Sequence, residues 1–206
     1  MHAFTSFKHL RRLILIPAAL ACLGWADSMQ ELQSTAATVT SVKAAFIQEK
    51  HMKILAHPLT SQGTFLFKAP DSLRWEYDRP VRSILVLHNG KIRRFVKKNG
   101  RLTEDASAGL QSMQVVVQEI TQWLGGRFEE NPAFTATLEP GAKIVMTPRD
   151  EAIARLVRRI EILLSDRPGV IKSVTIYESE DSFTRLDFRN VTLNSELDAD
   201  AFRTIK

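Results

Sequence analysis

The residues of this 206-residue sequence that could support acid–base or metal chemistry are few and scattered. Beyond residue 26 there are three histidines, His51, His57 and His88, and none lies in a His-Glu-x-x-His pattern or beside a cysteine cluster. Glu178 and Glu180 form a carboxylate pair that suits a strand end facing water. A Gly-x-Ser-x-Gly nucleophile motif and a phosphate-binding glycine loop are both missing. We therefore expect no catalytic residues, no metal site and no cofactor, and a protein that is not an enzyme.

The basic stretch Lys91–Lys98, KIRRFVKK, could contact nucleic acid, with Phe95 stacking on a base. A solvated strand face is the simpler interpretation, and attraction to anionic head groups or to an acidic partner is the alternative. The chain has 28 Lys and Arg against 23 Asp and Glu, and three of the basic residues lie within residues 1–26, which contain no acidic residue. Without that segment the net charge falls from +5 to +2. Such a small excess does not indicate a nucleic-acid partner.

The first 26 residues have the pattern of a secretory signal peptide. Three basic residues precede the apolar run 13–23, and Gly-Trp-Ala at 24–26 offers small residues at the −3 and −1 positions of a cleavage site after Ala26. The run is short for a membrane span. Cys22, the only cysteine, follows a loose lipobox, so a lipid-modified Cys22 is the alternative. We expect cleavage, a single mature domain over 27–206 and a periplasmic location in a Gram-negative cell.

The stretch 62–80, QGTFLFKAPDSLRWEYDRP, contains two runs in which apolar side chains recur with period two. This period is that of a strand with one apolar face. Residues 69–72 between the runs, APDS, favour a turn, because proline fixes φ and Asp and Ser bond their own backbone. The stretch is predicted to be a β-hairpin. Its apolar face carries Gly63, Phe65, Phe67, Leu73, Trp75 and Tyr77.

The rest of the chain extends this hairpin into an antiparallel meander. Asn-Gly pairs at 89–90 and 99–100 favour tight hairpin turns, because a type I′ turn needs positive φ at both central residues. Further strands are predicted at about 46–54, 83–87, 92–97, 102–103, 134–138, 143–147, 160–164, 174–176 and 183–190, followed by an irregular tail at 194–202.

Three segments have apolar residues at helical spacing. The first covers 28–43, with Leu32, Ala36, Val39 and Val42 on one side. The stretch 152–164 fits either one helix or a short helix at 151–156 followed by a strand, and the turn after it favours the second. The strongest signal is the central helix at 110–124. Its apolar side carries Leu110, Met113, Val116, Val117, Ile120, Trp123 and Leu124.

About eleven strands make a sheet that must curl, split or close, and large barrels and half-barrels enclose apolar cavities. The helices at 28–43 and 110–124 are the candidates to cover the concave face. Gly125 and Gly126 stop the central helix and could serve as a hinge for its movement. We expect the cavity to be lined by Phe65, Phe67, Leu73, Trp75, Tyr77 and Leu85, and the lid to present Met113, Val116, Val117, Ile120 and Trp123.

The sequence resembles the periplasmic outer-membrane lipoprotein carriers, the LolA-like proteins. The order of elements agrees over the whole chain beyond residue 26, and the likeness of sequence is concentrated between residues 46 and 92. The motifs that carry it are Phe46-Ile47-Gln48, Gly63-Thr64-Phe65-Leu66-Phe67, Lys68-Ala69-Pro70, Leu73-Arg74-Trp75, Pro80, Ser83-Ile84-Leu85-Val86 before Asn89-Gly90, and the closing segment 194–202.

The resemblance implies a mainly β fold, an incomplete antiparallel barrel with helices as a lid over an apolar cavity. It implies a monomer that accepts acyl chains of a lipoprotein, or a related lipid, from an inner-membrane donor transporter and passes them to an outer-membrane acceptor. Leu73 and Trp75 match positions that face the cavity. One departure concerns the lid latch: members of the family carry Arg before the motif's proline, where this chain has Ala69, and Lys68 points to the other face.

Two function classes follow from these patterns. The first is a lipid or lipoprotein carrier, for which an apolar cavity suffices because each methylene kept from water contributes about 0.8 kcal/mol. The second is a sensor or regulator of the same fold that binds a lipidated ligand and reports it to a membrane partner. A regulator usually has a further domain for that partner, and a sequence ending at Lys206 favours the carrier. The basic stretch Lys91–Lys98 indicates a divergent member.

Overall fold

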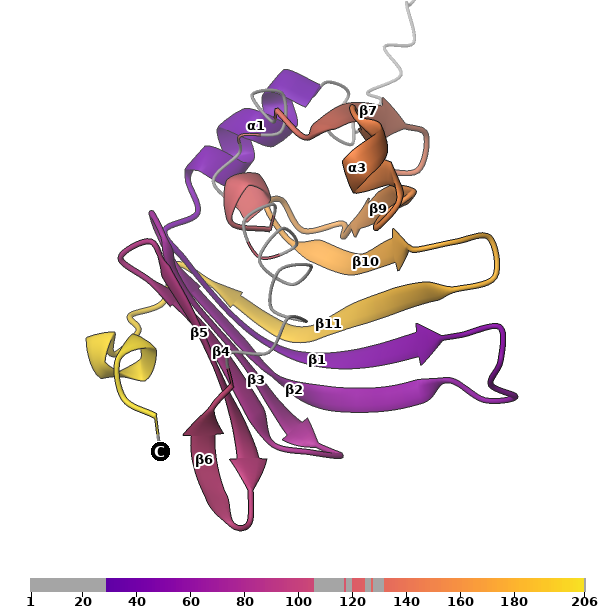
Figure 1. Cartoon of the computed structure of the whole chain (residues 1–206). Coiled ribbons are helices and arrows are strands. Elements are labelled where there is room, and N and C mark those ends of the chain that lie inside the picture. The colour runs from indigo at the N-terminus through magenta and orange to yellow at the C-terminus, as the bar shows by residue number, and fades with distance from the viewer. Residues whose placement is uncertain (1–28, 106–116, 118–119, 125–126, 128–131, 206) are drawn as a thin grey trace, which may run out of the picture.

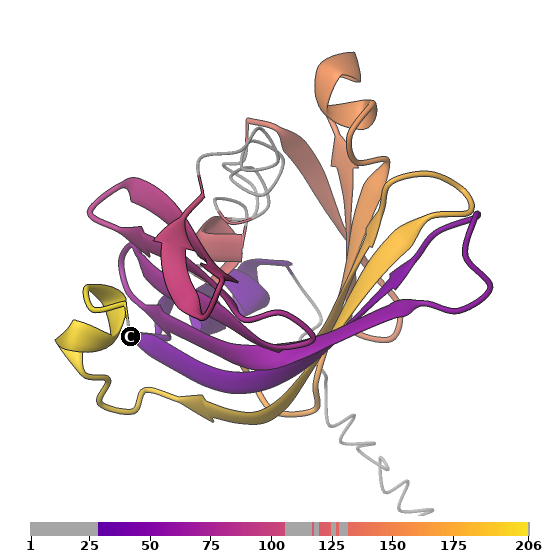
Figure 2. The same ribbon diagram turned by 60° about the horizontal axis from the view of Figure 1, so that its bottom comes forward.

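A computed structural model describes residues 29–105, 117, 120–124, 127 and 132–205 of the chain. Its eleven strands form one antiparallel sheet in the order β6-β5-β4-β3-β2-β1-β11-β10-β9-β8-β7. The sheet curls around a short helical segment at residues 120–124 (Figures 1 and 2). Among the described strands β6 and β7 form the two edges and do not pair with each other, so the barrel is incomplete. The mainly β, half-open fold predicted from the sequence is confirmed.

The first half of the sheet is a continuous meander. Its Asn-Gly turns have positive φ at both residues, 51° and 71° at Asn89 and Gly90 and 50° and 81° at Asn99 and Gly100, as predicted. The strands are β1 (Ser41–His51), β2 (Leu59–Lys68), β3 (Ser72–Arg79), β4 (Ser83–His88), β5 (Lys91–Lys98) and β6 (Arg101–Glu104).

The second half returns to the first by pairing β11 with β1. Helix α3 (Glu151–Ala154) begins at Asp150, whose side chain accepts a hydrogen bond from the backbone N–H of Ile153. A short helix followed by a strand was the favoured prediction for 152–164, and it is confirmed. The strands are β7 (Phe134–Glu139), β8 (Lys143–Pro148), β9 (Arg159–Leu164), β10 (Ile171–Tyr177) and β11 (Phe183–Leu193).

The first predicted helix is too long. Helix α1 covers Met29–Ala37, and β1 begins at Ser41, where the sequence suggested helix to 43 and a strand from 46 to 54. Val42 fits both periods, but Val42, Ala44 and Phe46 continue the alternation of the strand and are all buried. All three pair with β2, and Val42 and Phe46 also pair with β11, so the two ladders outweigh helical spacing. Three other strand ends differ from the predicted ends by about three residues. In the structure β2 begins at 59, β10 begins at 171 and β11 ends at 193.

The C-terminal segment lies on the convex face of the sheet. It contains a 3-10 helix, η1 (Ala199–Phe202), where an irregular tail was predicted, and it packs against β3 and β4. A small apolar cluster of Ile84, Val86 and Phe95, with Leu102 and Ile205 packed against it, forms on this face. The Arg74 guanidinium donates to the backbone carbonyls of Ala201 and Thr204, each at 3.0 Å.

The predicted signal peptide lies outside the described residues. Within the described part, no helix combines the length and the apolar character needed to cross a membrane.

Candidate functional site

Strand register places the predicted cavity residues on one inward face. Phe65 lies opposite Trp75, which lies opposite Leu85, and Phe67 lies opposite Leu73. Because side chains on paired positions share a face, this set forms a continuous inner surface. All five are buried, with at most 5% of the residue exposed, whereas Tyr77 is only partly buried.

The described part of the central helix, residues 117 and 120–124, packs onto this surface. Val117, Ile120 and Trp123 are 0%, 4% and 1% exposed and belong to the same apolar cluster as Phe65 and Trp75. These three residues, which were predicted to belong to the lid, thus lie in the apolar cluster of the concave face. Met113, Val116, Gly125 and Gly126, the other predicted lid and hinge residues, lie outside the described residues.

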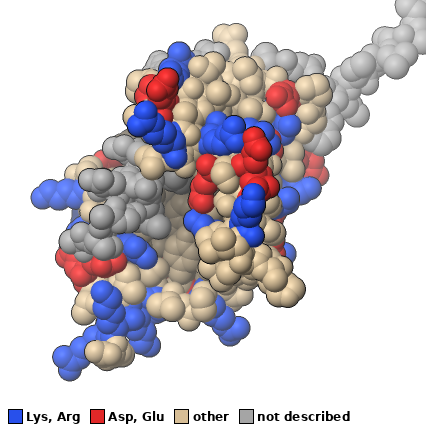
Figure 3. All heavy atoms as spheres, turned by 45° about the vertical axis from the view of Figure 1, so that its right-hand side comes forward, with Lys and Arg blue, Asp and Glu red and all other residues tan. Residues whose placement is uncertain are grey.

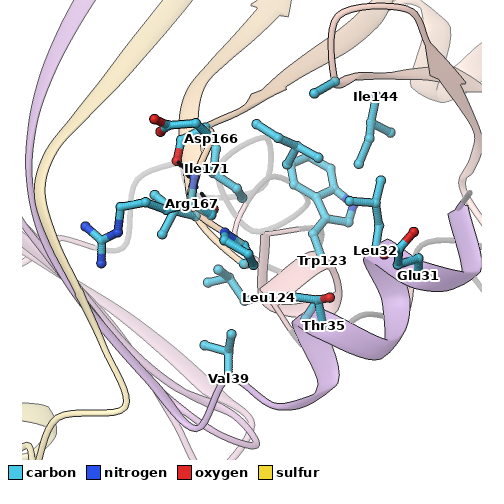
Figure 4. Close-up of a pocket in the computed structure, with 17 residues that line it drawn as sticks. Glu31, Leu32, Thr35, Val39, Trp123, Leu124, Ile144, Asp166, Arg167 and Ile171 are labelled. Atoms are coloured by element: carbon cyan, nitrogen blue, oxygen red, sulfur yellow. Dashed lines mark hydrogen bonds between the residues drawn. The ribbon is translucent and has the colours of Figure 1, made fainter. Parts of the chain in front are cut away.

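A hollow of about 450 Å³ opens between α1, the end of the central helix and the turn from β9 to β10 (Figure 4). We call it the apolar hollow. In the close-up the Trp123 ring stands at its centre, between Leu32 of α1 and Ile144 of β8. Its volume is within the roughly 300–1,000 Å³ of small-molecule sites. Its apolar lining consists of Leu32, Ala36, Val39, Trp123, Leu124, Ala142, Ile144, Leu164, Val170 and Ile171.

The lining of the apolar hollow also includes the polar residues Glu31, Thr35, Ser165, Asp166 and Arg167. Arg167 points away from the ring of Trp123 and donates to the backbone carbonyl of Val191 at 3.2 Å. Gly169, with φ of 73°, is close enough to α1 that an added Cβ would lie 3.3 Å from the Val39 side chain. The turn from β9 to β10 is thus fitted closely against the end of α1.

Trp123 carries an unused hydrogen-bond donor. Its indole Nε1 is buried and has no hydrogen-bond partner, and the same is true of Trp75. An unpaired buried donor costs roughly 1–3 kcal/mol. In Figure 4 the Trp123 nitrogen faces the side of Leu32, and side chains cover it, so an occupant reaches it only after they shift. An occupant with an ester or carboxyl oxygen could accept this hydrogen bond.

A narrow gap of about 30 Å³ continues from the apolar hollow under the sheet. It shares Trp123, Leu124, Gly169 and Ile171 with that hollow and reaches Phe65 on β2. A volume this small holds about one water molecule. Phe67, Leu73 and Trp75 on the concave face pack against their neighbours in the core. They line neither the apolar hollow nor the narrow gap.

A third hollow, of about 290 Å³, lies toward the other end of the strands. Its lining includes two arginines and no acidic residue, so we call it the cationic hollow. Two of the predicted cavity residues, Tyr77 and Leu85, belong to it. The full lining is Gln48, Ser61, Tyr77, Arg79, Pro80, Val81, Ser83, Leu85, Arg94 and Val96.

Burial raises the pKa of the Tyr77 hydroxyl above its ordinary value, and the positive charge of Arg94 offsets only part of this effect. The hydroxyl therefore stays neutral at physiological pH. It donates a hydrogen bond to Gln48 Oε1 at 2.7 Å. Tyr77 thus adds a polar group but no negative charge to the cationic hollow.

The six residues predicted for one cavity are divided among different surroundings. Phe65 lines the narrow gap, Tyr77 and Leu85 line the cationic hollow, and the other three lie in the packed core. Sequence reasoning missed the residues contributed by α1 and by the turn from β9 to β10, such as Leu32 and Ile171. Leu32 was placed on an apolar helix side, but no signal in the sequence showed that this side faces β8 and β10. Arg94 was missed although strand alternation could have located it.

Charges on the surface are mixed. Over the face shown in Figure 3, Lys and Arg side chains are interspersed with Asp and Glu. Within the described residues no three His, Cys, Asp or Glu side chains come together in a group that could hold a metal ion.

The comparison that decides the family is with a sequence model described as outer membrane lipoprotein carrier protein LolA, which matches residues 37–205. The chain belongs to this family. The family proposed from the motifs at 46–92 is thereby confirmed, and this LolA-like chain has the fold of a carrier family rather than of an enzyme family. No curated protein sequence matches it, as expected for a divergent member.

The solved structures that this LolA-like chain matches share little sequence with it. A DUF1329 family protein from Desulfovibrio piger has a TM-score of 0.48 and 10% identity, over 84% of this chain and 95% of that one. A LolA superfamily protein from Nitrosomonas europaea has a TM-score of 0.43 and 9% identity, over 86% and 98%. The MucA/MucB complex of Pseudomonas aeruginosa has a TM-score of 0.41 and 14% identity, over 85% and 59%.

Proposed function

We propose that this protein is a periplasmic carrier that holds an acyl chain of a lipoprotein, or of a related lipid, in the apolar hollow. The observation that carries the proposal is a hollow of about 450 Å³ with an apolar lining in a chain of the lipoprotein carrier family. Each methylene removed from water contributes about 0.8 kcal/mol, so even part of an acyl chain inside gives useful affinity. The narrow gap toward Phe65 offers a route for a longer chain if Ile120 and Trp123 move aside.

The proposal includes processing and partners. The chain is made with a signal peptide over residues 1–26, and residues 27–206 form one carrier domain that acts as a monomer. An inner-membrane transporter supplies the lipid and an outer-membrane acceptor removes it. No directional contact to the acyl chain is needed, provided that the acceptor binds it more tightly. The unpaired indole N–H of Trp123 supplies one polar contact, to an ester oxygen near the end of the chain.

The test uses the mature protein and a dansyl-labelled fatty acid. Beyond residue 26 the chain has two tryptophans, Trp75 and Trp123. In Trp75→Phe the remaining Trp123 should transfer energy to the bound dansyl group. In Trp123→Phe the remaining Trp75 should transfer less, because Trp75 lines neither the apolar hollow nor the narrow gap and so lies farther from the dansyl group. Absence of saturable binding by the wild-type protein contradicts the carrier function, and stronger transfer from Trp75 places the acyl chain elsewhere.

A further inference from the structure

The cationic hollow and the narrow gap lie along the same strand. On β1, Val42 and Ala44 border the narrow gap and Gln48 borders the cationic hollow. Four to six residues of extended chain separate the two spaces, which corresponds to roughly 13–20 Å. An amphiphile of that length with its chain under α1 could place a polar end in the cationic hollow.

Strand register explains why positive charge faces inward here. Leu85 of β4 lies opposite Arg94 of β5, and Leu87 lies opposite Ile92. Since Leu85 and Leu87 point to the concave side, their partners do so too. Arg93 is one residue away and points to the opposite face, where it pairs with Glu104. Within the basic stretch Lys91–Lys98, Arg94 is therefore the arginine that enters the concave side.

The charge of Arg94 is only partly compensated. Its Nη1 lies 3.5 Å from Asp105 Oδ2, a long single contact rather than a two-pronged pair. The other oxygen of the same carboxylate is 3.9 Å from Lys98 Nζ. One carboxylate thus serves two cations, and the guanidinium has five N–H donors to offer. The Arg94 side chain is 28% exposed, which leaves it accessible to a ligand from the hollow.

Other groups around Arg94 add to an anion-binding character. Arg79 at the end of β3 lines the same hollow, together with the hydroxyls of Ser61 and Ser83. Tyr77 stays neutral and so does not compete as an anion for Arg94. The exposed Val81, at 56%, and Pro80 form an apolar margin beside these polar groups. Positive charge, hydroxyl donors and an apolar margin suit the polar end of an amphiphile.

We propose that the cationic hollow binds an anionic group, a phosphate or a carboxylate, through Arg94 and Arg79, and that this group is the head group of the carried lipid. The second half of this inference rests on the proposed carrier function. The first half, an anion site in the concave face, stands on the geometry of the hollow alone.

The test compares two lysolipids with identical acyl chains, the anionic lysophosphatidylglycerol and the uncharged monoacylglycerol, by calorimetric titration below their micelle concentrations. The wild-type protein should bind the anionic lysolipid at least tenfold more tightly. Arg94→Gln should remove this preference while it leaves the affinity for the uncharged lysolipid within about twofold. Arg79→Gln, at an exposed position, should reduce the preference by a smaller factor, and it serves as the second variant if Arg94→Gln melts well below the wild type.

Arg93→Gln is the matched control, because it removes the same charge from the next residue but from the other face. It should keep the preference. Loss of the preference in Arg93→Gln and Arg94→Gln alike would show general electrostatic attraction and overturn the site. Equal binding of both lysolipids by the wild type would also overturn it.

Glycerol phosphate and inorganic phosphate, titrated alone, separate the two sources of the anion. If one of the two compounds binds as tightly as the anionic lysolipid, and if its binding depends on Arg94, the site belongs to a soluble phosphate compound. Weaker binding of both supports a head group joined to a bound chain. If phosphate binds while neither lysolipid does, the anion site stands and the carrier function fails. If both lysolipids bind equally, the carrier function stands and the anion site fails.

Discussion

The apolar hollow and the cationic hollow are built on the same concave face of one sheet, and they differ in what supplies their walls. The apolar hollow takes its walls from outside the meander, from α1, the central helix and the turn from β9 to β10. The cationic hollow is lined mainly by inward side chains of β1 to β5 and the turn between β3 and β4. Elements that cover a sheet can create an enclosed apolar space. Within the sheet, alternation decides which side chains of a strand reach the concave face, so a basic strand can place a single arginine there.

The largest expected effect concerns the close approach of β2 and β3, two strands whose other residues line the narrow gap and the cationic hollow. Gly63 lies opposite Tyr77, beside a shift in the register of β2 and β3, and a Cβ there would overlap the backbone carbonyl oxygen of Glu76. Gly63→Ala should therefore lower the free energy of unfolding by about 3 kcal/mol, the upper end for overpacking. Chemical denaturation measures it.

Gly141→Ala is the control for that variant, since φ is 84° there and no atom lies within 4 Å of an added Cβ. It should cost only about 1 kcal/mol, for the backbone conformation. Equal losses in the two variants would mean that β2 and β3 do not approach each other at Gly63 as closely as described.

The apolar hollow is probed by Leu32→Asn on α1. An amide that meets an acyl chain without a hydrogen-bond partner costs roughly 1–3 kcal/mol, so the dissociation constant for the dansyl fatty acid should rise about tenfold or more. Gln30→Asn, at an exposed position of the same helix, should leave it unchanged. The preference for the anionic lysolipid should persist in Leu32→Asn, and its disappearance would mean that the two hollows are not separate sites.

The position of α1 over the apolar hollow depends on Asn194. Its Oδ1 accepts from the backbone N–H of Thr40 at 2.8 Å, and its Nδ2 donates to the carbonyl of Thr38 at 3.3 Å. Asn194→Ala should lower the unfolding free energy by about 1–2 kcal/mol and weaken fatty-acid binding.

Asn190 is the matched control for that substitution, with φ of 53° against 55° at Asn194 and an exposed side chain. Asn190→Ala loses no such link to α1. A fatty-acid affinity that changes equally in both alanine variants would refute the role of Asn194 in holding α1.

The smallest effect concerns pH and Tyr77. Because the folded-state pKa of its hydroxyl is raised, the stabilisation is complete below the unfolded pKa of about 10 and is lost as pH rises above it. The wild type should lose about 1 kcal/mol more than Tyr77→Phe between pH 9 and pH 11, as measured by urea denaturation. Identical pH profiles would show that Tyr77 is well solvated and that the cationic hollow is more open than described.

The sheet was predictable from the sequence because its signals are local. The alternation of Phe65 and Phe67, and of Leu73 and Trp75, survives in the structure as an inward face. The turns at Asn89-Gly90 and Asn99-Gly100 fix the pairing of the strands on either side. The end of α1 was not predictable in the same way, because Val42 fits a helix as well as a strand. Pairing with β11, which is distant in sequence, decides the structure there.

The hollows were less predictable, because volume depends on how distant elements meet. Nothing near Leu32 in the sequence shows that Ile144 and Ile171 stand across from it. The inward position of Arg94 could have been derived, since the Asn89-Gly90 turn pairs His88 with Lys91 and so places Arg94 opposite Leu85. The stretch Lys91–Lys98 was interpreted as one solvated strand face, and the alternation of its side chains between the two faces was therefore overlooked.

The pairing of β1 with β11 has a consequence for the order in which the chain folds. Every other strand pair joins neighbours in sequence, so each half of the sheet can form from local contacts. The β1–β11 ladder connects opposite ends of the chain, and contacts of such long sequence separation form slowly. During synthesis from the N-terminus, β1 would keep one unpaired edge until β11 has been made. That edge is a place where a second chain could add, and a holdase that shields it would raise the yield of the folded protein.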